Sequence, residues 1–138
     1  MRVLRASLVV SALLIGLVAQ PASAAHWTSA TAVSGNPSCV GGTKIEPVAD
    51  GTYAVSFGGF AGTITIDVSS SAAGTVFSFV TDNSSHVVTS ILVKGGPNAL
   101  LYTYSPGTTA DSGLHSPDNP NSGKYYGLSH LCFFTAKK

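Results

Sequence analysis

Apolar and polar residues alternate along several stretches of the chain with a period of two, as in half-buried β-strands. The alternation runs over residues 52–57, 63–68 and 75–80. No stretch beyond residue 25 keeps a 3.6-residue apolar period for three turns, so we expect no long helix there. The pattern predicts an all-β chain of roughly seven or eight strands, folded as a two-sheet antiparallel sandwich.

The strongest local signal is a hairpin over residues 87–104. Its first strand is rich in β-branched residues, and Gly95-Gly96-Pro97-Asn98 predicts a tight turn. On the second strand, Tyr102 and Tyr104 share one face because they are two positions apart. A further apolar stretch at 128–135 predicts the closing strand.

Residues 105–127 separate that hairpin from the closing strand. They contain three prolines and four glycines, which interrupt regular structure too often for the interior of a strand or helix. A connection of this length in a compact domain is typically an ordered loop with a function. We therefore expect 105–127 to be a loop that carries binding specificity.

The N-terminus has the features of a secretory signal peptide. A basic start is followed by an apolar run over 8–18 and by Ala22-Ser23-Ala24, a small-residue cleavage site. The apolar run is shorter than the ~20 residues that span a bilayer. We predict a signal peptide at 1–24, a flexible segment at 25–38 with room for a short strand near Trp27, and a single domain at 39–138.

The charge that remains after signal removal is small. Five lysines face six carboxylates without any arginine, a net charge of −1. Nucleic-acid binding needs a basic footprint that this composition lacks. The same sparsity argues against docking on anionic membranes. The predicted partner is therefore a neutral extracellular glycan or protein.

The two cysteines agree with export to an oxidising compartment. Cys39 and Cys132 have no Cys-x-x-Cys context and are expected to form one disulfide around nearly the whole domain. In the chain-entropy account, a loop of about this length contributes about 4–5 kcal/mol to stability.

Aromatic rings with polar tips supply a candidate ligand platform. Its predicted residues are Tyr102, Tyr104, Tyr125, Tyr126, Asp111 and His115. The commoner alternative is that strand tyrosines are half-buried and structural.

Two other chemistries are compatible with the residues. A small hydrolase is conceivable with Asp111, His115 and His130, although Ser129 and His130 point to opposite faces of a strand and a Gly-x-Ser-x-Gly elbow is missing. Oxygen ligands in the loop permit calcium, but Pro120 interrupts the EF-hand pattern, so a turn is the simpler reading of Asp118-Asn119-Pro120. The sequence predicts no required cofactor.

Several motifs in a fixed order resemble a largely uncharacterised secreted bacterial domain. The motifs are Cys39…Lys44-Ile45-Glu46-Pro47, Gly51-Thr52-Tyr53, Val93-Lys94-Gly95-Gly96, Tyr102-Thr103-Tyr104, Asp111-Ser112-Gly113-Leu114-His115-Ser116-Pro117 and Ser129-His130-Leu131-Cys132-Phe133. The family's last cysteine follows the phenylalanine, whereas Cys132 precedes it here. The resemblance implies an exported or surface-anchored domain and supplies no catalytic residues.

These observations favour a non-enzymatic binding module. Its expected contact surface is the tyrosine-bearing strand together with the 105–127 loop. The alternatives are the small hydrolase and a secreted inhibitor or effector that acts through that loop.

Overall fold

The computed structural model describes residues 26–57, 60–82 and 85–138. The predicted signal peptide lies outside the described residues. Within them, no helix is long and apolar enough to cross a membrane.

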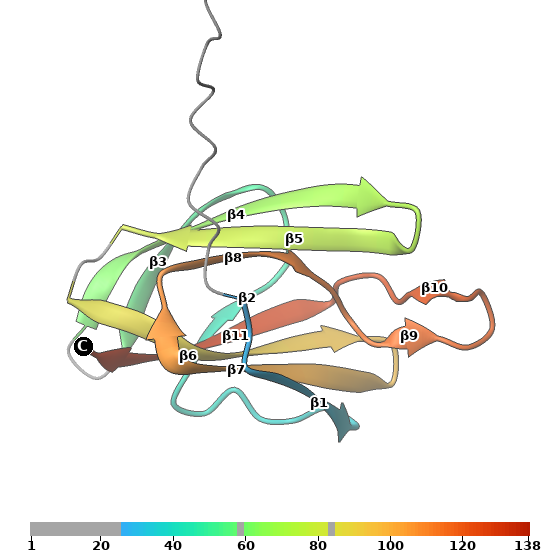
Figure 1. Ribbon diagram of the computed structural model, residues 1–138, viewed down its shortest axis with the longest axis horizontal. Coiled ribbons are helices and arrows are strands. Elements are labelled where there is room, and N and C mark those ends of the chain that lie inside the picture. Colours follow the sequence, from blue (N-terminus) through green and yellow to red (C-terminus); the bar gives the residue numbers. More distant parts are fainter. Residues whose placement is uncertain (1–25, 58–59, 83–84) are drawn as a thin grey trace, which may run out of the picture.

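Two antiparallel sheets form a sandwich, which confirms the predicted fold class (Figure 1). The five-stranded sheet has the order β1-β7-β6-β11-β2, with β1 at Ser29–Ser34, β7 at Asn98–Thr108, β6 at His86–Gly95, β11 at His130–Lys137 and β2 at Thr43–Ile45. The four-stranded sheet has the order β3-β4-β5-β8, with β3 at Gly51–Phe57, β4 at Phe60–Ser71, β5 at Gly74–Thr81 and β8 at Ala110–Leu114. A separate hairpin pairs β9 at Asp118–Asn119 with β10 at Lys124–Tyr125.

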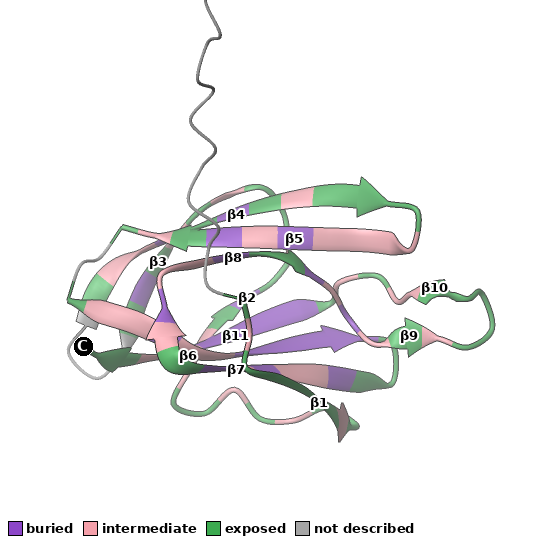
Figure 2. Ribbon diagram, in the orientation of Figure 1, coloured by how far each residue is buried: buried purple, intermediate pink, exposed green. Residues whose placement is uncertain are grey.

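The core lies between the two sheets, where alternate strand residues meet (Figure 2). Its buried members are Ile45, Val55, Ile64, Ile66, Phe77, Phe79, Val88, Ile91, Val93, Tyr102, Tyr104, Leu114, Leu131 and Phe133. Phe79 packs edge-on against both Phe133 and Tyr104, and so joins the two sheets across the middle. The period-two pattern of the sequence is therefore the pattern of this core.

The hairpin predicted at 87–104 is confirmed and is longer than predicted. β6 ends at Gly95 and β7 begins at Asn98, with these two residues opposite each other. Gly96 has a φ of 60° as the first central residue of the two-residue turn, which is the position of a type II′ turn that needs glycine. The Gly-Gly-Pro motif is thus architectural.

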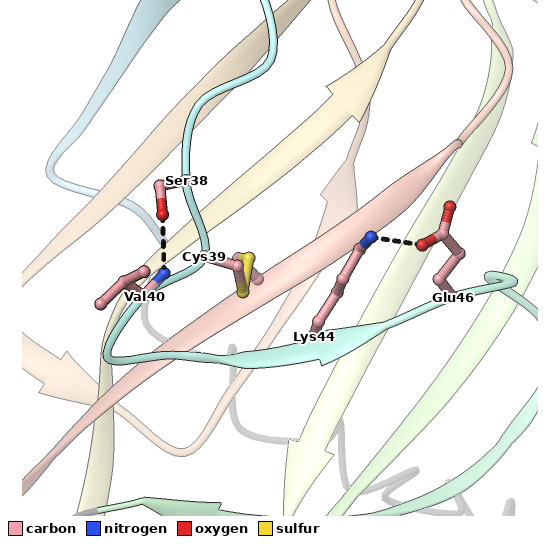
Figure 3. The surroundings of a disulfide bond; sticks show 6 residues. Ser38, Cys39, Val40, Lys44 and Glu46 are labelled. Atoms are coloured by element: carbon pink, nitrogen blue, oxygen red, sulfur yellow. Dashed lines mark hydrogen bonds and ion pairs between the residues drawn. A yellow bond between two sulfur atoms is a disulfide. The ribbon is translucent and has the colours of Figure 1, made fainter.

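The chain from β1 to β2 crosses the outer face of the five-stranded sheet, because these two strands occupy its opposite edges. A second apolar cluster lies under this crossing, formed by Leu92, Ala99 and Cys132 with Val33, Cys39, Leu101 and Phe134 packed against it. The predicted disulfide between Cys39 and Cys132 fixes the crossing to β11, with the two Cα atoms 5.7 Å apart. Figure 3 shows the bond beside the exposed ion pair of Lys44 and Glu46.

Two sequence predictions differ from the structure. The short strand allowed near Trp27 is β1, which pairs with β7 over six positions, so the strands of the sandwich begin before residue 39. Residues 105–127 were expected to be one loop, but they contain the end of β7 and all of β8, β9 and β10. Pro106 and Gly107 are tolerated because they lie on the part of β7 beyond its pairing with β1, where the pairing with β6 is also irregular. The other glycines and prolines lie on the edge strand β8, in the β9–β10 turn or between strands.

Candidate functional site

Tyr102 and Tyr104 lie inside the sandwich and cannot form an exposed platform, which corrects the sequence-based prediction. Their exposed fractions are 0% and 4%. Tyr102 is opposite Ile91, a core residue, so the face that the two tyrosines share is the inner one. Burial raises the pKa of Tyr102 to about 12, and its hydroxyl donates to the carbonyl of His115 at 3.0 Å.

Asp111 is a buried carboxylate on the edge strand β8. The Tyr104 hydroxyl donates to its Oδ2 at 2.9 Å, and the backbone N–H of Ser112 donates to its Oδ1 at 2.7 Å. Burial, followed by this hydrogen bond to Asp111, raises the pKa of Tyr104. These two interior hydrogen bonds occupy both carboxylate oxygens, so an external ligand cannot bind Asp111 in their place.

His26 completes this cluster from the N-terminal segment. Its Nδ1 lies 3.2 Å from Asp111 Oδ1, and its side chain is 59% exposed whereas that of Asp111 is 2% exposed. The next residue, Trp27, packs edge-on against Tyr102 with ring centroids 4.9 Å apart. The segment therefore closes the flank between the two sheets. Sequence reasoning did not place His26 here, since no local signal connects residue 26 with residue 111.

The other predicted residues gather at one end of the sandwich, where the β9–β10 hairpin projects (Figure 1). His115 stacks on Tyr125 with ring centroids 3.7 Å apart and planes 7° apart. Both residues are partly exposed. We call His115, Tyr125, Tyr126 and the hairpin residues 118–124 the end surface.

Contacts to both sheets hold the end surface in place. The backbone N–H of Tyr125 donates to the carbonyl of Ala73 in the β4–β5 turn at 2.7 Å. Tyr126 lies over the β6–β7 turn so closely that a Cβ at Gly96 would be 2.6 Å from its ring. Ser116 Oγ donates to the Tyr126 carbonyl. The hairpin therefore rests on one turn from each sheet, which makes it a rigid projection.

His130 belongs to a different region. It is buried on β11 opposite Lys94, whose Nζ donates to the carbonyl of Gly96. Burial lowers the pKa of His130, and Lys44 adds to this effect. Asp111, His115 and His130 thus have separate partners, so the structure does not assemble the predicted hydrolase set.

Two of the oxygen ligands considered for calcium already bond within the fold. Asp111 bonds to Tyr104, whereas Asn119 Oδ1 accepts from the backbone N–H of Asn121 and so forms the hairpin turn. Across the described ranges, no group of three or more His, Cys, Asp or Glu side chains is arranged to hold a metal ion. The part of the sequence around Asp118 acts as a turn former.

No family model, curated protein or solved structure matches this chain. The resemblance to a secreted bacterial domain therefore stays a prediction from its motifs.

Proposed function

We propose that this protein is a secreted, non-enzymatic module that binds a neutral ligand, a glycan or a surface protein, through the end surface. The observation that carries the proposal is the stacking of His115, which follows β8, on Tyr125 of the projecting β9–β10 hairpin. Part-exposed rings offer a flat apolar face together with polar tips, which suits sugars and polar protein surfaces.

The chemistry of the hairpin supports a neutral ligand. Asp118 and Lys124 are both exposed and of opposite charge, so the projection has no net charge. Amide and hydroxyl groups of Asn121 and Ser122 are exposed between them. Such groups donate and accept hydrogen bonds without favouring ions of either sign.

Secretion is part of the same proposal. The leader over 1–24 has the three regions of a signal peptide. Within the described residues every cysteine is disulfide-bonded, as in proteins of oxidising compartments. Together they support export of the folded domain.

A glycan array probed with the mature protein tests the proposal. Tyr125→Ala should abolish binding at the end surface, whereas Tyr125→Phe keeps the stacked ring and should retain most of it. Thr52→Ala, on the exposed outer side of the four-stranded sheet, is the control for non-specific effects. Absence of glycan binding, or binding that survives Tyr125→Ala, contradicts the glycan form of the proposal.

The projection also fits the alternative of a secreted inhibitor or effector, because a rigid hairpin can enter a cleft of another protein. In that case the protein binds no glycan on the array, whereas the wild type binds a protein partner and Tyr125→Ala does not. Binding of Tyr125→Ala and Tyr125→Phe to glycans and to proteins therefore distinguishes the two kinds of ligand.

A further inference from the structure

The outer edge of β1 is an open strand edge. β1 is the last strand of the five-stranded sheet and pairs with β7 on one side. In the part of the chain that the structure describes, no strand pairs with its other side. Figure 1 shows β1 at the margin of the sandwich, away from the four-stranded sheet. Open edges present unpaired N–H and C=O groups that can template another strand.

The register identifies the backbone groups that face outward. In the two-residue turn, Gly95 and Asn98 exchange hydrogen bonds, so alternate residues from Asn98 onward bond to β6. The residues between them, including Thr103, bond toward β1, and the Thr103 carbonyl indeed accepts from the N–H of Thr28 at 2.7 Å. Their partners on β1 are Ser29, Thr31 and Val33. The groups left for the open edge are those of Ala30, Ala32 and Ser34.

Natural sheets usually protect such an edge with charge, proline or a covering segment. The sequence of β1, SATAVS, has neither charge nor proline, no charged residue occurs from Trp27 to Thr43, and among the residues that the structure describes no strand covers its outer edge. At the opposite edge, β2 is three residues long, and its Lys44 forms an ion pair with Glu46, the residue that follows the strand. On β8, His26 covers Asp111 from the N-terminal segment.

We propose that β1 pairs with β1 of a second copy of this chain, in an antiparallel two-fold dimer. Placing Ala32 on the two-fold axis pairs Ala32 with itself and Ala30 with Ser34, so every outward group of the three residues finds a partner. On the other face, Thr31 then lies across from Val33 of the second copy, a favourable pair of β-branched residues. A second copy fits better than a charged peptide, because two uncharged identical edges meet without repulsion. This proposal is independent of ligand binding at the end surface.

Proline provides a selective test. Ala32→Pro removes one outward N–H and leaves the β1–β7 hydrogen bonds intact, since proline is tolerated on an edge strand where its nitrogen faces solvent. The matched control is Ala54→Pro on β3, the other long uncharged edge. Ala54 lies opposite Thr63, whose N–H and carbonyl both bond to Asp82, so the Ala54 groups also point outward.

Sedimentation equilibrium of the oxidised mature protein measures the outcome. The wild type and Ala54→Pro should be dimeric, and Ala32→Pro should be monomeric with an unchanged circular dichroism spectrum. Ala32→Lys should also yield monomers, because two like charges would meet at the axis. A monomeric wild type at every soluble concentration overturns the proposal, as does a dimer lost in Ala54→Pro and kept in Ala32→Pro.

Discussion

The buried hydrogen bond between Tyr104 and Asp111 should make a measurable contribution to stability. Tyr104→Phe deletes the hydroxyl that lies 2.9 Å from Asp111 Oδ2 and leaves a carboxylate oxygen without that donor in the interior. Both residues are at most 4% exposed. A hydrogen bond to a charged group contributes about 1.5–3 kcal/mol net. We expect a loss of about 2 kcal/mol, which lowers Tm by about 8 °C for a domain of this size.

Urea titration of the oxidised mature protein measures this loss as a lower midpoint at unchanged m-value. Tyr53→Phe is the matched control, because its hydroxyl donates to the neutral carbonyl of Ala49 at 2.8 Å near the surface and should contribute less than about 1 kcal/mol. In an Asp111→Ala background, Tyr104→Phe should have little further effect, since the two groups act as a pair. Equal losses in the two backgrounds would refute the pairing argument.

Three more predictions follow from burial and chain connectivity. Burial raises the pKa of Tyr102 to about 12, whereas a free tyrosine ionises near 10, so the contribution of the neutral side chain to stability is complete below about pH 10. Raising the pH to about 12 should lower the free energy of unfolding by about 2–3 kcal/mol in urea titrations, and Tyr102→Phe should abolish this pH-dependent loss. Because burial lowers the pKa of His130, stability should fall as pH drops below about 6.5, where the unfolded chain takes up a proton first; His130→Gln should flatten this dependence, and an unchanged slope contradicts it. The double variant Cys39→Ala with Cys132→Ala should lose about 4–5 kcal/mol, measured against the oxidised protein; a loss under about 1 kcal/mol contradicts the loop-closure argument.

The strongly alternating strands could be predicted from the sequence because their pattern is local. The stretches around Val55, Ile64 and Phe77 all became strands with those residues in the core. Alternation also showed that Tyr102 and Tyr104 share a face, but which face is buried depends on the register with β6 and on the second sheet. That information is not local, so the tyrosines were placed on the wrong side.

The remaining errors have the same origin. The residues of β1 are mostly small or polar, and they form a strand only because β7 offers a partner far along the chain. Val33, for example, lies opposite Ala99, 66 positions away, and no local propensity encodes such a pairing. His26 meets Asp111 through the same fold-level arrangement, at a sequence separation of 85. By contrast, the disulfide was predictable, since a secreted chain with two cysteines has one simple pairing.

The Cys39–Cys132 bond has a mechanical consequence. The two residues are 93 positions apart and lie close to the two ends of the described chain. Tension applied between those ends passes through the sulfur atoms and bypasses everything between them, including the whole four-stranded sheet. Under load, only β1 and the part of β11 after Cys132 can be peeled away. The covalent bond therefore makes the domain a nearly inextensible link.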